Sequence, residues 1–116
     1  MVVDTAISRT DEVFHALSDA TRRDIVARVM DSELSVTALA GHYDMSFAAV
    51  QKHVAVLERA QIIAKRRHGR ERMVSANGPG LADARRVLDD LEGVWRGRLE
   101  RIEGLLVESL EEGEWL

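Results

Sequence analysis

The last third of the chain carries an apolar repeat that limits the folds open to it. Between residues 81 and 110, apolar side chains recur every three or four positions, which is the spacing of one face of an α-helix. Such a helix would be about 45 Å long at a rise of roughly 1.5 Å per residue. A monomer of 116 residues has no core that runs along a stripe of this length. We therefore expect a partner helix, most simply from a second copy of the chain related by a two-fold axis.

The larger side chains of this repeat form the expected dimer interface. They are Leu88, Leu91, Trp95, Leu99, Ile102 and Leu106. Three glycines in the same stretch weaken helix propensity, so that two helices either approach closely there or the helix bends. Residues 77–80 contain the only Pro and two of the eight Gly. We expect them to separate this helix, predicted over residues 81–110, from the preceding part of the chain.

Basic charge is concentrated in the middle of the chain. The formal net charge is −4, yet residues 46–80 hold seven basic and only two acidic side chains, between flanking segments that are net acidic. Affinity for a polyanion depends on the local field more than on the total charge, so this stretch is compatible with a phosphate-contacting surface. An ordinary solvated face is the alternative.

Composition also limits the class of protein. The length suits one domain, here residues 1–116. No run approaches the roughly eighteen uncharged apolar residues of a membrane helix, and the first residues lack the basic and apolar segments of a signal peptide. We therefore expect a cytoplasmic protein without a membrane partner. The chain has no Cys, which excludes disulfides and thiolate metal sites.

Helical patterns fill the first sixty residues. Apolar residues recur at helical spacing over residues 11–17, 21–30 and 35–42. Ser46 is a good N-cap for a longer helix over residues 46–60. Three aliphatic residues at positions i, i+4 and i+7 form its expected core face: Val50, Val54 and Leu57. A short helix, a tight turn and a second helix with polar residues on its outer face are typical of a helix-turn-helix, whose second helix enters a major groove.

A basic hairpin is expected directly after this helix. Residues 61–66 and 71–75 are short segments typical of strands, and Gly69 can supply the turn between them. The hairpin, taken as residues 62–75, is similar to the wing of a winged helix-turn-helix. Its basic side chains can reach phosphates or a minor groove beside the second helix.

The expected DNA-contacting residues lie on the second helix and on the hairpin. They are Ser46, Ala48, Ala49, Gln51, Lys52, His53, Arg59, Lys65, Arg66, Arg67, Arg70 and Arg72. Gln51 can form a bidentate contact with adenine, Lys52 can reach guanine or a phosphate, and Ala49 can touch a thymine methyl group. For His53, a bond to the backbone or to a phosphate is favoured over a metal site. Phosphate contacts by the hairpin would add affinity rather than sequence specificity.

Together these motifs resemble the ArsR family of bacterial winged helix-turn-helix repressors, over roughly residues 14–74. Residues 14–25, FHALSDATRRDI, look like the opening helix pair of the family, and residues 46–57, SFAAVQKHVAVL, look like its recognition helix. The resemblance implies a mainly α fold with a small β-hairpin wing. The winged helix-turn-helix would cover residues 11–76, followed by a long C-terminal dimerisation helix over residues 81–110.

This chain departs from the family pattern at several positions. Gln51 stands where Ser is usual, Val54 where Leu is usual, and Gln61 where Gly is usual. The change at Gln51 can alter base readout, whereas the other two concern structure.

The best-known members of this family sense metals, and this chain lacks both of their recurrent sites. Ser35 and Thr37 stand where the resemblance places two thiolate ligands, and hydroxyls are poor ligands for soft ions. Residues 81–116 contain no His for the other recurrent site, which uses His and carboxylates. The resemblance is therefore closer to the subgroup that regulates without a metal, and we expect no metal and no cofactor.

We expect a homodimeric transcriptional repressor that binds a palindromic operator in double-stranded DNA. The alternative is a winged-helix protein-interaction module that does not read DNA, for which Gln51 in place of Ser is the support. An enzyme is not expected, because the sequence has no phosphate-binding Gly-Lys loop and no nucleophile elbow. The signal that releases DNA stays open between autorepression, a small-molecule ligand at the dimer interface and a partner protein.

Overall fold

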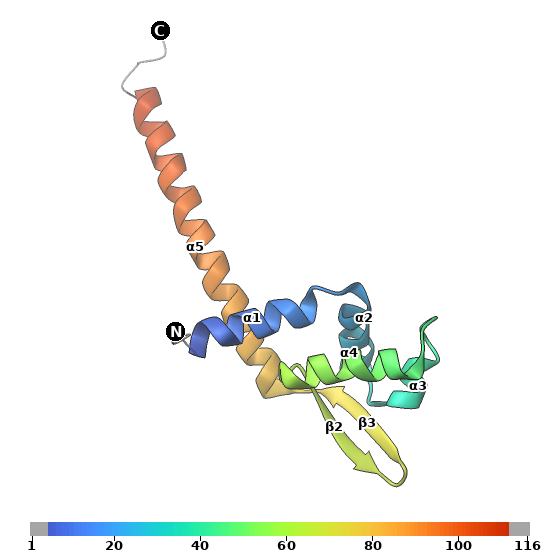
Figure 1. Cartoon of the computed structure of the whole chain (residues 1–116). Helices are drawn as coiled ribbons and strands as arrows, with labels where there is room; N and C mark the ends of the chain where they lie inside the picture. The colour runs from blue at the N-terminus through green and yellow to red at the C-terminus, as the bar shows by residue number, and fades with distance from the viewer. Residues whose placement is uncertain (1–4, 112–116) are drawn as a thin grey trace. The chain divides into compact units, whose positions relative to one another are not determined.

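The fold is mainly helical, with a small antiparallel sheet, which confirms the predicted fold class (Figure 1). The computed structural model describes residues 5–111, with side chains from residue 9 onward. In chain order, the helices and strands are α1 (Thr5–Leu17), α2 (Ala20–Asp31), β1 (Leu34–Ser35), α3 (Val36–Ala40), α4 (Phe47–Arg59), β2 (Ile63–His68), β3 (Glu71–Ala76) and α5 (Gly78–Glu111). The chain divides into two compact units, up to Ala84 and from Arg85 onward. Helix α5 begins in the first unit and continues through the second.

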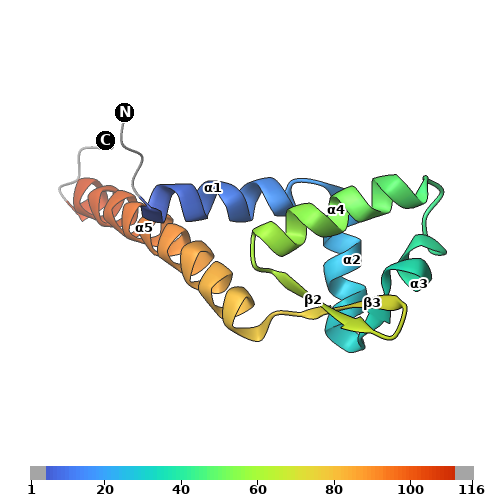
Figure 2. The same ribbon diagram turned by 60° about the horizontal axis from the view of Figure 1, so that its bottom comes forward.

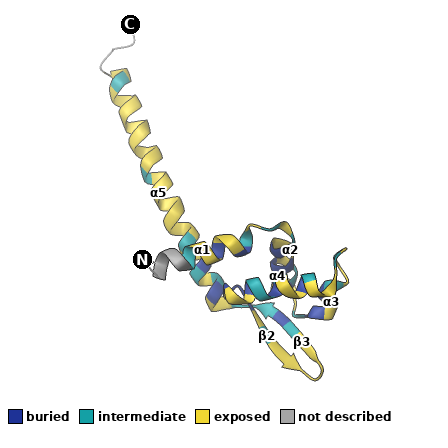
Figure 3. Ribbon diagram, in the orientation of Figure 1, coloured by how far each residue is buried: buried dark blue, intermediate teal, exposed yellow. Residues whose placement is uncertain are grey.

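The core of the first unit lies between α2, α3, α4 and the sheet. Its largest fully buried side chains are Val13, Ile25, Leu39, Val50, Val54, Leu57, Ile62, Ile63 and Val74. The predicted core face of α4 is therefore confirmed. Helix α4 packs on α2 and α3 (Figure 2), and buried positions alternate with exposed ones along these helices (Figure 3). The opposite side of α4 stays available for a ligand.

The sheet has three strands, whereas the sequence predicted only a hairpin. Strand β1 pairs with β3, Leu34 opposite Val74, so that the strand order is β1-β3-β2. Strands β2 and β3 extend to His68 and from Glu71, which leaves only two residues for the turn. Gly69 has a φ of 63°, the conformation that such tight hairpin turns require. The predicted four-residue connection was therefore too long.

Helix α5 starts earlier than predicted. The sequence placed a linker at residues 77–80, but the helix begins at Gly78. The side-chain oxygen of Asn77 accepts a hydrogen bond from the Gly80 amide, 3.2 Å away, and so caps the first turn. Pro79 lies in that first turn, where an amide hydrogen has no helical partner and its absence costs nothing. Helix α1 likewise extends back to Thr5, beyond the predicted start at residue 11.

A backbone junction joins the end of α4 to the start of α5. Gln61, directly after α4, has a φ of 60°, the left-handed conformation that usually falls to Gly. A Cβ atom on Gly80 would lie 1.6 Å from the carbonyl oxygen of Gln61, so the two backbones touch at a position where only Gly fits. From α1, Arg9 donates hydrogen bonds to the Ala60 carbonyl and, at 2.7 Å, to the carboxylate of Asp83. Three helices therefore meet at this point.

This junction predicts different effects for two glycines in one helical turn. Gly80→Ala should lower the free energy of unfolding by at least about 2 kcal/mol, because its methyl group would overlap a backbone atom that cannot move alone. Gly78→Ala is the control, since no atom lies within 4 Å of its added Cβ, and its effect should stay within about 0.5 kcal/mol. Urea unfolding followed by circular dichroism measures both. Equal stabilities would contradict the close contact.

Candidate nucleic-acid interface

Hydrogen bonds hold the turn before α4 both at Ser46, where the helix starts, and at Tyr43, where the turn begins. The hydroxyl of Ser46 accepts a hydrogen bond from the Ala49 amide, 3.1 Å away, which is N-cap geometry. Ser46 was predicted as a DNA contact, and its hydroxyl serves the helix start. On the other side, the hydroxyl of Tyr43 donates to Asp24 in α2 at 2.6 Å, and Arg28 donates to the same carboxylate at 2.8 Å. Burial and this bond raise the pKa of Tyr43 to about 12.

The outer face of α4 is small and polar, as the sequence predicted. Ala48, Gln51, Lys52 and Arg59 are exposed, while Ala49 and Ala55 are half-buried. Small side chains beside Gln51 and Lys52 allow a close approach of a flat surface such as the edge of a base pair. This face is therefore shaped for contact with a groove.

His53 anchors α4 to the corner between α1 and α2. Its Nδ1 lies 3.2 Å from a guanidinium nitrogen of Arg22 and 3.9 Å from the Asp19 carboxylate. Because Arg only donates, a neutral His53 ring accepts at Nδ1 and carries its proton on Nε2. Arg22 is buried, and it also donates to the carbonyls of His15 and Ala16, each at 2.8 Å. The hydrogen bond of the His53 ring is thus to the Arg22 side chain, whereas the sequence predicted a bond to the backbone or to a phosphate.

Two of the predicted basic contacts on the wing, the β2–β3 hairpin, are bound to carboxylates of the same chain. Arg66 donates to Glu33 through Nε at 2.8 Å and through a second nitrogen, and this pair lowers the pKa of the Glu33 carboxyl. Lys65 lies 3.4 Å from the carboxylate of Glu58. These two cations are therefore partly neutralised before any ligand approaches.

The remaining wing cations lie near its tip. Arg67 and Arg72 are directly opposite each other in the β2–β3 register, so that their side chains leave the hairpin on the same face. Like charges in this register repel each other, and a bound anion would remove the repulsion. Arg70 and Arg72 are exposed, and within residues 9–111 neither forms an ion pair. The wing tip is therefore the part best suited to hold a phosphate.

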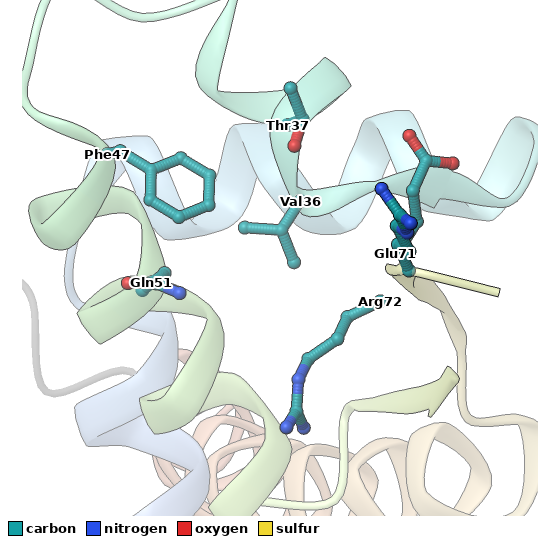
Figure 4. A pocket seen from close by; sticks show the side chains of 7 residues that line it. Val36, Thr37, Phe47, Gln51, Glu71 and Arg72 are labelled. Carbon is teal, nitrogen blue, oxygen red and sulfur yellow. The ribbon is translucent and has the colours of Figure 1, made fainter. Parts of the chain in front are cut away.

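A hollow of about 200 Å³ connects the wing tip to α4 (Figure 4). The residues that line it come from the starts of α3 and α4 and from the wing: Val36, Thr37, Phe47, Gln51, Arg70, Glu71 and Arg72. Phe47 is 46% exposed there and was missed by the sequence prediction. Its place four residues before Gln51, hence on the same side of the helix, is the signal that could have found it. Residues predicted to read bases and residues predicted to contact phosphates thus line one depression.

Ser35 and Thr37 occupy the positions where the resemblance places thiolate ligands. Ser35 is the N-cap of α3, and its hydroxyl accepts a hydrogen bond from the Ala38 amide at 3.0 Å. Thr37 lines the hollow beside α4. Among the described residues, no three His, Asp or Glu side chains are grouped as metal ligands would be.

The second unit presents its apolar stripe to solvent in the single chain. All six predicted interface residues are exposed, from 41% at Leu88 to 59% at Trp95. The stripe is wider than predicted, because Val94, Leu105 and Val107 are also more than half exposed. No helix within residues 5–111 has the length and hydropathy needed to cross a bilayer.

The chain is similar to several transcriptional regulators. It is 38% identical over 79 residues to the HTH-type transcriptional regulator Rv2034 of Mycobacterium tuberculosis, covering 68% of this chain and 74% of that protein. It is 30% identical over 74 residues to the transcriptional repressor SdpR of Bacillus subtilis, covering 64% and 82%. A solved structure, an ArsR-like transcriptional regulator from Rhodococcus sp. RHA1, matches with a TM-score of 0.73 at 28% identity, over 88% of this chain and 96% of that one. No protein-family model matches the sequence.

The Arg22 contacts predict a large difference between two adjacent arginines. Arg22→Ala should lower the free energy of unfolding by about 2–4 kcal/mol, because two carbonyls and the His53 ring lose a buried donor. Arg23→Ala should cost less than about 1 kcal/mol, since Arg23 donates to Leu17 in an exposed place where water can replace it. Urea unfolding at one protein concentration compares them, and equal losses would contradict the role given to Arg22.

Proposed function

Because this chain belongs to the ArsR family of winged helix-turn-helix transcriptional regulators, we propose that it is a homodimeric repressor that binds a palindromic DNA operator. The observation that carries the proposal is the depression that the outer face of α4 and the cationic tip of the wing form together. A groove of duplex DNA offers base edges between two phosphate backbones, which matches a readout helix flanked by cations.

Each part of the surface has its own task. Helix α4 enters the major groove, where Gln51 reads adenine and Lys52 reaches guanine or a phosphate. Arg67, Arg70 and Arg72 hold phosphates or enter the adjacent minor groove. Lys65 and Arg66 contribute less, because Glu58 and Glu33 already neutralise them.

The remaining predicted contacts have supporting tasks. Ser46 sets the start of α4, and His53 keeps the helix in place against Arg22 while its Nε2–H can bond a phosphate. Ala48 and Ala49 permit close approach to base edges, and Arg59 extends the basic surface to the C-terminal end of the helix.

Dimerisation supplies the second half-site. The exposed stripe of α5, from Leu88 to Leu106, is covered by the same stripe of a second chain. Two recognition helices related by a two-fold axis then read a palindrome in successive major grooves, about 34 Å apart. Occupation of this site excludes other proteins from the same DNA, which is the simplest route to repression. Ser35 and Thr37 leave no thiolate switch, so release follows a signal other than a soft metal.

Selection of duplexes from a random pool tests the DNA-binding proposal. We expect a palindromic sequence to be enriched, and Gln51→Ala to change the preferred bases at one position of each half-site. Arg72→Ala should weaken binding to all sequences and lower the slope of log affinity against log salt by about one.

The matched variant for the wing is Arg66→Ala. It should weaken binding less than Arg72→Ala, because Arg66 is already bonded to Glu33. Binding that does not depend on salt, or a pool without enrichment, would contradict the proposal and favour a protein-interaction module.

Introducing a charged side chain into the apolar stripe of α5 tests the proposed dimer separately. Leu99→Glu should convert the dimer to a monomer, because a carboxylate would be buried in an apolar interface without a partner. Arg86→Glu introduces the same side chain on the opposite side of α5, outside the stripe, and should remain dimeric. Sedimentation equilibrium measures the mass of each. A monomeric wild-type chain, or a dimer that survives Leu99→Glu, argues against this interface.

A further inference from the structure

Phe47 lies in an unusual place for a large aromatic residue. It is the first residue of α4, and 46% of its surface is exposed although the core face of this helix is already complete with Val50, Val54 and Leu57. The fold therefore does not need an aromatic ring at this position. Figure 4 shows the ring at one side of the hollow, with Gln51 one turn further along the same helix.

The hollow combines an apolar wall with a polar rim. Phe47 and Val36 form the apolar part, whereas Gln51 and Arg72 place polar groups at its border. Glu71 also lines it, and this carboxylate disfavours a free anion inside the hollow. This lining suits a small apolar group on an uncharged polar ring, while the arginines at the border hold a polyanion beside it.

A thymine in duplex DNA has this chemistry. Among the four bases, only thymine presents a methyl group in the major groove, and a Phe side chain is a suitable apolar contact for it. We propose that Phe47 is a specificity residue that reads the 5-methyl group of a thymine in each half-site. The inference rests on the proposed operator binding, and it names a base that the polar residues of α4 do not read.

Helix geometry places this thymine relative to the adenine contacted by Gln51. Residues four apart lie about 6 Å apart along a helix axis, while successive base pairs lie about 3.4 Å apart. The thymine therefore lies one or two base pairs from that adenine. Arg72, which also lines the hollow, then contacts the backbone that flanks the same step.

Replacement of single thymines by uracil tests the proposal. Uracil pairs as thymine does and lacks only the methyl group, so each duplex differs from the selected operator by one methyl group. For the wild-type chain, one thymine per half-site should show a three- to five-fold loss of affinity, about the effect of burying one methyl group. Phe47→Ala should bind both duplexes equally, and Phe47→Leu should keep part of the discrimination.

The measured quantity is the ratio of the affinities for the thymine duplex and the uracil duplex. A variant that is partly unfolded loses affinity for both duplexes equally, so the ratio does not change. Met30→Ala is the matched control, because Met30 is 61% exposed on α2 and does not line the hollow. It should discriminate as the wild-type chain does.

The outcomes separate this inference from the proposed function. Specific, salt-dependent operator binding with no thymine sensitive to uracil would overturn the role of Phe47 and leave the repressor proposal intact. Sensitivity that persists in Phe47→Ala would assign the methyl contact to another residue, such as Ala49, and would also overturn it. A pool from which no sequence is enriched would overturn both proposals.

Discussion

A buried guanidinium group controls the placement of the recognition helix. Arg22 belongs to α2, and its guanidinium group lies at the C-terminal end of α1, where the free carbonyls of that helix give a partial negative charge that favours a cation. The same group reaches His53 in the middle of α4. An unpaired buried charge is costly, so Arg22 must keep its bonds to the α1 carbonyls and to His53 at the same time. These bonds couple the corner between α1 and α2 to the orientation of α4. The outer face of α4 is therefore aimed by a contact on its inner side.

The charge available to DNA differs from the charge counted in the sequence. Residues 46–80 are strongly basic, but Glu33 and Glu58 each hold one of the wing cations near the base of the hairpin. Among the described residues, the wing cations without an ion pair thereby lie at its tip, where Arg67 and Arg72 oppose each other, while Lys52 and Arg59 add charge along α4. Such an arrangement concentrates positive charge beside the outer face of α4, while the chain as a whole stays acidic.

Local patterns in the sequence predict most of this fold. The errors of the prediction have physical causes. The three aliphatic residues that repeat along α4 and the cap at Ser46 are local signals, and both were predicted. Strand β1 has only two residues, which are too few to show an alternating pattern. It forms by pairing with β3, about forty residues later in the chain. The loop predicted before α5 fails because Asn77 caps a helix in which Pro occupies a permitted place.

The candidate site likewise combines features that local patterns predict with features that depend on residues far apart in the chain. The polar face of α4 and the basic hairpin follow from periodicity and composition. The ion pair of Arg66 with Glu33 joins residues far apart in the chain, so no local pattern reports it. Phe47 was overlooked because an apolar residue at a helix start is ordinarily assigned to the core. Only the approach of the wing to α4 shows that it borders a hollow.

The wing is closed at its base. The Asn77 amide donates to the Ile62 carbonyl at 3.0 Å, and Gly80 touches Gln61, so the hairpin leaves and rejoins the body of the protein at one place. Changes of hairpin length beyond this base leave the ends of α4 and α5 where they are. Evolution can therefore lengthen, shorten or recharge the wing as a separate module, and related chains can adjust how tightly the wing holds a polyanion without rebuilding the rest of the fold.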